Sequence, residues 1–531
     1  IRRTGLYCRA RTREVNAPSS GGAARSGSPD ARRVSACACA SAVTGCSCGS
    51  PVVLVVCGVP LRHDAIDRCI RANRQRCQWP NDTAGRRMLH SAGSGHPPGR
   101  CAPVRGTHND RRAHSRPPPD MEPTDLSPAF SPLQIGPLTL RNRLIKSATN
   151  EGMTPNGVPS RALVRFHERI AEGGAALTTV AYCAISDDGR TFVDQARLDV
   201  PTVRQFRALT DAVHRHGAAA SAQITHGGCF TFLPSLSTRR PLSASGGFNK
   251  VGVMSGRFLK QAMTHDQMST VADEFAQAAR HARDAGFDAV EIHMGHGYLL
   301  SQFLSPLYNR RRDAYGGDAA RRAAFPVEVL RRVLDAVGRD LAVVCKIGVT
   351  EGVRGGGTAD DACEIARRLE AEGAHLLVLS GGMNVESVWQ LFGSPLPGDA
   401  LANADNAIVR TAMALQRLTE PKMGVFREMY FLEHSKKVRA AVRMPLAYLG
   451  GVRSRENVEL AMREGFDAVA LARALVFEPD FVNGLRDGRF VQSGCTSCNR
   501  CVVSMYTPGG TACVLREPND PAPNRVPAAG A

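Results

Sequence analysis

From Met121 onward, two hydrophobic patterns alternate along the chain. Stretches with apolar residues three or four positions apart, typical of helices that bury one face, are followed by short continuous apolar runs. At five such joints, within 171–180, 215–224, 284–293, 371–380 and 463–472, a glycine separates the two patterns. Glycine adopts the left-handed conformation that ends a helix, and a continuous apolar run is typical of a strand buried on both faces. The repeat therefore predicts helices alternating with parallel strands.

Three more apolar runs, at 143–147, 341–347 and 446–449, bring the number of predicted strands to eight. Amphipathic helices fit between them, for example at 268–285 and 319–337. Eight strands alternating with helices predict an α/β protein with a (β/α)₈ (TIM) barrel. A doubly wound sheet would place Gly-x-Gly-x-x-Gly after its first strand, and none stands there.

Two of the predicted strand-to-helix connections are long. They follow strands 3 and 6 and span 227–265 and 381–431. Because the chemistry of such barrels lies at the carboxyl ends of the strands, we expect these connections to cap a substrate pocket.

Residues 1–120 have no sustained period and are interrupted by Pro-Pro, Ser-Gly and Gly-Gly pairs. Nine of the 17 cysteines lie there, including Cys37, Cys39, Cys46 and Cys48, without the Cys-x-x-Cys and His spacing of a zinc site. An organelle transit peptide, a basic nucleic-acid arm and a low-complexity extension that is disordered all fit. We favour the extension, since the sequence from Met121 reads as a natural start of the protein. The predicted organisation is this extension at 1–120, a barrel at 121–485 and a cysteine-containing segment at 486–531.

The formal net charge of +18 first suggests a nucleic-acid partner. However, residues 1–120 hold 20 Arg, no Lys and 7 acidic residues, so they carry +13 and the remainder carries only +5. A nucleic-acid partner is therefore not favoured.

The longest apolar run, 52–57, is too short to cross a bilayer, so we expect no membrane partner. We expect a cytoplasmic protein whose cysteines are reduced thiols. Organelle targeting by residues 1–120 is the alternative.

The end of predicted strand 4 brings together three side chains that carry protons. His293, His296 and Tyr298 lie within six residues. Imidazole N–H groups can donate to a substrate oxygen, and a phenol can deliver a proton. A zinc pair and buried structural histidines are the alternatives, but no third metal ligand stands near by. We interpret the three as catalytic.

Other strand ends suggest a site for a flat, anionic cofactor. Strand 3 ends with Gln223, whose amide suits the edge of a heterocycle, and small residues follow strand 1. Lys346 lies in strand 5, where it faces either an anionic ring or a neighbouring carboxylate. Backbone N–H groups and an arginine after strands 7 and 8 predict a phosphate site at Gly450, Gly451, Ala472 and Arg473.

Four cysteines follow the predicted barrel. Cys495, Cys498, Cys501 and Cys513 have the spacing C-x₂-C-x₂-C-x₁₁-C. Four thiolates so spaced can ligate a [4Fe–4S] cluster. A thiol loop without metal and a zinc site remain as alternatives.

The chain from 133 to 481 resembles the old yellow enzyme family of FMN-dependent oxidoreductases, through the stretches 135–144 and, above all, 293–317. The resemblance implies an FMN whose ring contacts Ala148, Tyr182 and Gln223, with Lys346 at its N1/O2 edge. It implies that the phosphate is held by the residues that follow strands 7 and 8, namely Gly450, Gly451, Ala472 and Arg473. It also implies that His293 and His296 bind a substrate oxygen and that Tyr298 donates the proton. Asn150 stands where relatives carry Cys or Thr near the flavin, and Cys229 replaces a common Arg. The cysteine segment is similar to those of 2,4-dienoyl-CoA reductase and trimethylamine dehydrogenase.

By this resemblance we expect an oxidoreductase that passes hydride from NAD(P)H through FMN to an activated alkene such as an enone or enal. An iron–sulfur flavoprotein of the dienoyl-CoA reductase type is one alternative. An RNA-modifying flavin barrel, or nucleic-acid binding through the N-terminal arm, is another. The expected partner is a small-molecule substrate, and a homo-oligomer is left open.

Overall fold

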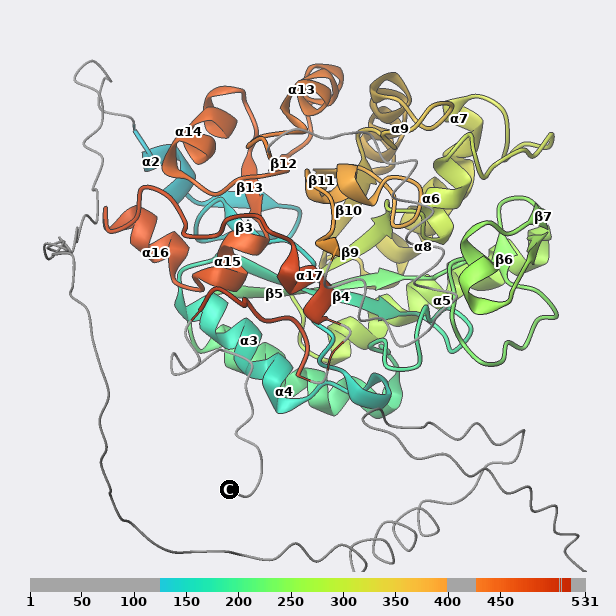
Figure 1. Cartoon of the computed structure of the whole chain (residues 1–531), viewed down its shortest axis with the longest axis horizontal. Coiled ribbons are helices and arrows are strands. Elements are labelled where there is room, and N and C mark those ends of the chain that lie inside the picture. Colours follow the sequence, from blue (N-terminus) through green and yellow to red (C-terminus); the bar gives the residue numbers. More distant parts are fainter. Residues whose placement is uncertain (1–124, 399–425, 506, 508, 517–531) are drawn as a thin grey trace, which may run out of the picture. The chain divides into compact units, whose positions relative to one another are not determined.

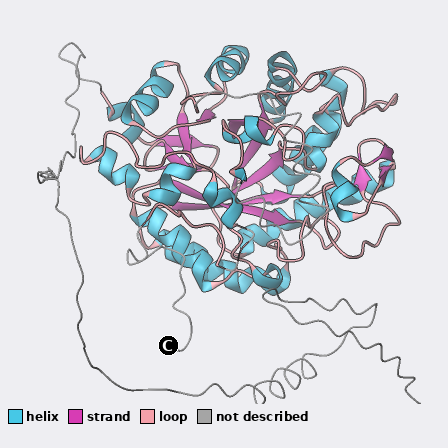
Figure 2. Ribbon diagram, in the orientation of Figure 1, coloured by secondary structure: helices cyan, strands magenta, loops and turns pink. Residues whose placement is uncertain are grey.

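A computed structural model of the chain describes residues 125–398, 426–505, 507 and 509–516 (Figure 1). The predicted extension at 1–120 and most of the connection after strand 6 lie outside these residues. The described part contains a closed barrel in which each strand lies parallel to its neighbours (Figure 2). Its strands, in chain order, are β3 (Leu144–Lys146), β4 (Leu177–Ala184), β5 (Ala219–Thr225), β9 (Ala289–Met294), β10 (Ala342–Gly348), β11 (Leu376–Ser380), β12 (Leu446–Leu449) and β13 (Ala468–Leu471).

Helices surround this barrel, and the predicted (β/α)₈ fold is confirmed. The longer helices are α3 (Arg161–Glu172), α4 (Val203–His214), α5 (His265–Asp284), α8 (Ala324–Val337), α9 (Ala359–Glu372), α13 (Leu432–Ala441) and α14 (Arg455–Arg463). The short ones are α2 (Ser127–Phe130), α6 (Leu299–Leu304), α7 (Ala319–Arg322), α10 (Val388–Phe392), α15 (Arg473–Phe477), α16 (Phe481–Arg486) and α17 (Arg500–Ser504), with 3₁₀ turns η1 (Pro155–Gly157), η2 (Val200–Thr202) and η3 (Val251–Ser255).

The glycine joints have the predicted conformation. Each of the five carries a glycine with positive φ between helix and strand, for example Gly373 at 100° and Gly465 at 82°. A side chain at such a φ would be strained, so glycine lets each helix end and each strand start within a few residues. The joints thus set the spacing of the barrel.

The expected single helix at 319–337 is wrong: α7 ends at Arg322 and α8 begins at Ala324. Pro326 explains the break, because proline has no N–H and its ring clashes with the carbonyl four residues earlier, that of Arg322. Pro326 is instead accommodated in the first turn of α8, where no N–H is needed.

The barrel interior changes character from one end to the other. The hairpin of β1 (Leu133–Ile135) and β2 (Leu138–Leu140) packs with inward apolar residues such as Val344 and Val378, and these close the amino-terminal end. Toward the carboxyl ends of the strands the buried residues include Lys146, Glu291 and Lys346. Buried charges are costly unless paired, so this end is built for polar chemistry.

The connection after β5 contains a small three-stranded sheet rather than irregular loop alone. Its strands are β6 (Leu242–Ser243), β7 (Gly247–Phe248) and β8 (Leu259–Ala262). Among the described residues, no helix is both long enough and apolar enough to cross a bilayer.

Candidate active site

The three side chains predicted after strand 4 lie together. His293 belongs to β9, and His296 and Tyr298 lie in the turn between β9 and α6. The ring centroids of His293 and His296 are 4.9 Å apart, and those of His293 and Tyr298 are 4.8 Å apart. His296 has a φ of 63°, an unusual backbone conformation for a non-glycine residue, which turns the chain back after the strand. Strain of this kind is often found at functional sites.

Both histidines are neutral at pH 7. Burial is the main cause that lowers the pKa of His293 well below its usual value, and electrostatic repulsion of a second proton by His296 and Lys346 adds to it. Burial lowers the pKa of His296 to about 3. The Gly295 N–H donates to His293 Nδ1 at 3.4 Å, which leaves the proton on Nε2. Each neutral ring can therefore donate one hydrogen bond without adding charge to the site.

Ser380, at the end of β11, is a neighbour that sequence reasoning missed. Its hydroxyl lies 2.8 Å from His296 Nε2 and can hold this ring in one tautomer. Ser380 is buried, and its only sequence signal is a polar residue closing an apolar strand.

Aromatic rings form a wall beside this group. The Tyr298 ring lies 5.4 Å from that of Tyr182 and 5.8 Å from that of Phe230, and Ala148 packs on the same cluster. The pairing of β4 with β5 is irregular between Val180 and Cys183. A bulge at this point re-aims side chains, which explains how Ala181 and Tyr182 both join the wall.

The buried cation predicted in strand 5 has a carboxylate partner. Lys346 Nζ lies 3.0 Å from Glu291 Oε1 and 3.0 Å from the Ser147 hydroxyl. Gln223 Nε2 donates to the same carboxylate oxygen at 2.6 Å. The ion pair that was the alternative for Lys346 is therefore present. Glu291 also links two of the predicted cofactor residues, Lys346 and Gln223. Sequence reasoning missed Glu291, although a single acid inside the run Ala-Val-Glu-Ile-His marks it.

A second buried charge cluster anchors the loop after β3, which carries Ala148 and Asn150. Lys146 donates to Glu151 and, at 2.9 Å, to the Thr179 carbonyl. Glu151 Oε2 also accepts from the Ala181 N–H at 3.2 Å, which ties this loop to β4. Burial raises the pKa of Glu151 despite the adjacent ammonium group.

The residues at the barrel mouth fit an FMN. The Thr149 and Thr225 hydroxyls, at the ends of β3 and β5, are buried and have no hydrogen-bond partner among the described residues. Unsatisfied buried hydroxyls call for a partner that the described residues do not supply. Directly after β12, where the sequence predicts a phosphate site, Gly450 and Gly451 have φ of 148° and 77°. A Cβ on Gly451 would lie 3.1 Å from the Met429 backbone nitrogen, so a side chain would crowd the turn.

The C-terminal cysteines lie near one another but do not form a metal site in the described residues. Cys495 is buried, and Cys498, Cys501 and Cys513 are half-buried, all as free thiols. Burial, with a smaller effect of the other thiols, raises the pKa of Cys501 to about 12. Within the described part of the chain, no three His, Cys, Asp or Glu side chains are gathered closely enough to hold a metal ion.

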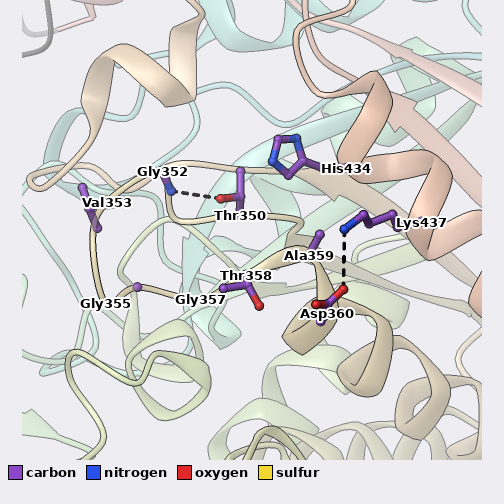
Figure 3. Close-up of a pocket in the computed structure, with 11 residues that line it drawn as sticks. Thr350, Gly352, Val353, Gly355, Gly357, Thr358, Ala359, Asp360, His434 and Lys437 are labelled. Carbon is purple, nitrogen blue, oxygen red and sulfur yellow. Dashed lines mark hydrogen bonds and ion pairs between the residues drawn. The ribbon is translucent and has the colours of Figure 1, made fainter.

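A separate cavity of about 420 Å³ lies beyond β10 (Figure 3). It is lined by the glycine-rich turn before α9 and by His434 and Lys437 of α13. Lys437 lies 3.7 Å from Asp360 in the first turn of α9. None of the residues predicted for the active site lines this cavity.

Sequence comparison identifies the family. The profile of the NADH:flavin oxidoreductase / NADH oxidase family matches residues 128–387. The 4,4'-dithiodibutanoate disulfide reductase of Rhodococcus erythropolis is 40% identical over 73% of this chain and 95% of its own length. The chain therefore belongs to the NADH:flavin oxidoreductase / NADH oxidase family, a family of oxidoreductases that includes relatives of the old yellow enzyme type.

Other relatives are more distant. The NADH oxidase of Thermoanaerobacter brockii is 30% identical over 70% of this chain and 52% of its own length, so the chain spans about half of that relative. Among solved structures, morphinone reductase has a TM-score of 0.54 at 23% identity, covering 70% of this chain and 93% of its own. 2-Naphthoyl-CoA reductase has a TM-score of 0.59 at 21% identity, covering 71% and 54%. These two likenesses support the fold.

Proposed function

We propose that this protein is an FMN-dependent reductase that uses NAD(P)H to reduce an activated alkene, such as an enone or enal. The observation that carries the proposal is the convergence of His293, His296 and Tyr298 beside an aromatic wall at the carboxyl end of the barrel. Bound FMN would supply the hydride transfer between nicotinamide and substrate.

The chain's own residues would orient and polarise the substrate. Neutral His293 and His296 donate hydrogen bonds to its carbonyl oxygen, which draws electron density away from the β-carbon. Tyr298 delivers a proton to the α-carbon. The rings of Tyr182 and Phe230 exclude water and hold the substrate flat.

FMN would be held by three parts of the barrel mouth. Ala148, Asn150 and Tyr182 would line the ring, with Gln223 and Lys346 at its polar edge. The phosphate would lie at the ends of β12 and β13, the usual phosphate site of such barrels, where the family resemblance puts Gly450, Gly451, Ala472 and Arg473. Thr149 and Thr225 have buried hydroxyls with no hydrogen-bond partner among the described residues, and these would bond the ligand.

An organic disulfide is a second candidate substrate. The relative from Rhodococcus erythropolis is named for the reduction of a disulfide and aligns over nearly its full length. Cleavage of a disulfide by two electrons and two protons gives two thiols, and Tyr298 would protonate a departing thiolate.

The iron–sulfur alternative has weaker support. The cysteine spacing favours it, but the described thiols are not gathered into a ligand set, so no step of the proposal involves a cluster. Iron and sulfide analysis of the purified protein tests this alternative.

The proposed function is tested on the purified full chain. We expect flavin absorption near 450 nm, release of FMN on denaturation, and NAD(P)H oxidation that depends on cyclohexenone or on 4,4'-dithiodibutanoate. Comparison of kcat/KM for the two acceptors decides between the alkene and the disulfide. A protein that neither carries nor takes up FMN would refute the proposal.

A further inference from the structure

The C-terminal segment makes direct contact with the loops that would hold the flavin. The Thr511 N–H donates to the Glu151 carbonyl at 2.7 Å, and its hydroxyl donates to the Asn150 carbonyl at 2.8 Å. Arg453, just after the Gly450–Gly451 turn, donates to the Cys495 carbonyl at 2.9 Å. The segment therefore contacts the loops after β3 and β12, and a further contact involves the residues after β13.

Asn499 makes the contact with the loop after β13. It lies between Cys498 and Cys501, is only 1% exposed and has a φ of 59°. Its Nδ2 donates to the Ser394 carbonyl at 3.0 Å and to the Pro395 carbonyl at 3.1 Å. Its Oδ1 accepts from Arg473 Nη1 at 2.5 Å. The N–H groups of the Asn499 amide thus fix its orientation, and its oxygen holds the guanidinium group of Arg473.

Arg473 is held by uncharged groups that do not use all of its N–H donors. It is the first residue of α15, directly after β13, and lies 5.3 Å over the Phe426 ring. Its hydrogen bonds go to uncharged groups, namely Asn499, the Ser497 carbonyl and the Tyr430 side chain, and no carboxylate pairs with it in the part of the chain that the structure describes. A guanidinium group has five N–H donors, so the bonds to Asn499, Ser497 and Tyr430 still leave donors for an anion.

Holding this side chain in place matters for binding. A free arginine has many side-chain rotamers, and this conformational entropy is lost when it binds a ligand. A side chain already fixed by its neighbours has lost part of that entropy before the ligand arrives, so binding is tighter.

We infer that Asn499 is a positioning residue for the phosphate of FMN, acting through Arg473. The cysteine-containing segment then completes the phosphate site, whether or not it binds a metal. This inference rests on the proposed function, because it assumes that a flavin phosphate lies beside Arg473. It makes a selective prediction: loss of the Asn499 side chain weakens binding of FMN, which has a phosphate, but not of riboflavin, which lacks one.

The test is an Asn499→Gly variant of the full chain. Glycine suits a φ of 59°, so the side chain is removed without adding backbone strain. Asn156→Gly is a control for the backbone change, since Asn156 has a φ of 56° and lies in the 3₁₀ turn η1, where its N–H donates to Asp194. FMN and riboflavin are titrated into deflavinated protein while flavin fluorescence is followed.

We expect Asn499→Gly to raise the Kd for FMN about tenfold and to change that for riboflavin less than twofold, with Asn156→Gly like wild type. In an Arg473→Gln background, Asn499→Gly should add nothing, because the two residues act as one unit. If the glycine variant does not fold, Asn499→Asp replaces it. Its carboxylate would neutralise Arg473, so the same FMN-selective loss is expected.

Each other outcome is decisive. Equal weakening of both flavins means that Asn499 has only a structural role, and unchanged FMN binding by a folded variant means that Arg473 does not depend on it. Either result overturns the inference while the proposed function stands. A wild-type chain that binds neither flavin overturns both.

Discussion

At the scale of single residues, Tyr298 has the most specific proposed role. Its ring contacts His293, Tyr182 and Phe230, so a phenylalanine would keep the packing and lose only the hydroxyl. We expect Tyr298→Phe to lower kcat for alkene reduction about a hundredfold, within the usual range for loss of a general acid.

The measurement separates the two half-reactions by stopped flow. Reduction of the protein by NAD(P)H should be unchanged in Tyr298→Phe, and only reoxidation by the alkene should slow. Tyr308→Phe is the control, since the Tyr308 hydroxyl donates to Glu386, outside the proposed site. An equal loss in both half-reactions would contradict the role of Tyr298 as a proton donor.

The buried histidines predict how stability depends on pH. His296 has a pKa of about 3 in the folded chain against an ordinary value of 6.5, so only the unfolded chain takes up its proton as the pH falls below 6.5. Unfolding is then favoured by up to about 1.4 kcal/mol per pH unit. We expect urea unfolding to show that wild type loses about 2 kcal/mol more stability than His296→Asn between pH 6.5 and 5. Parallel pH profiles would contradict the burial of a neutral ring.

How far the sequence could define this site depends on where each partner lies in the chain. His293, His296 and Tyr298 lie within six residues, so one strand end was enough to predict that they converge. Ser380 contacts His296 from 84 residues away, and Glu291 meets Gln223 from 68 residues away. Such pairs are fixed by the register between strands, which no local pattern contains.

At the scale of elements, neighbouring strands carry the buried charged and polar side chains. Lys346 and His293 are register partners on β10 and β9, and Glu291 and Gln223 are partners on β9 and β5. The eight strands and the five glycine joints could be predicted because both depend on local conformation. The bulge in β4 and the sheet of β6, β7 and β8 could not, since each depends on contacts distant in sequence.

The Glu291–Lys346 pair predicts a non-additive effect on stability. Glu291→Leu would leave a buried ammonium group without its carboxylate, which costs about 3–5 kcal/mol. Adding Lys346→Met removes the remaining charge. We therefore expect the double variant to be more stable than Glu291→Leu alone, as measured by chemical denaturation. A double variant with the summed loss of the two single variants would mean that the pair does not interact.

At the scale of the whole molecule, the distribution of charge separates two kinds of binding. Residues 1–120 carry +13 of the net +18, whereas every residue of the proposed site lies beyond Met121. Electrostatic binding to nucleic acid depends on the number of cations that neutralise phosphates and weakens steeply with salt. The RNA-modifying and nucleic-acid alternatives can therefore be tested apart from the flavin chemistry.

The two parts of the chain should respond differently when separated. We expect a chain beginning at Met121 to keep FMN binding and NAD(P)H-dependent reduction at the level of the full chain, since no proposed site residue is removed. Any retention of RNA by the full chain in low salt should disappear from the shorter chain, because its net charge is only +5. Gel-shift titrations at 50 and 200 mM salt, together with steady-state rates, measure both properties. Salt-dependent RNA binding by the shorter chain would instead favour an RNA substrate for the barrel, whereas loss of flavin chemistry would give residues 1–120 a part in the active enzyme.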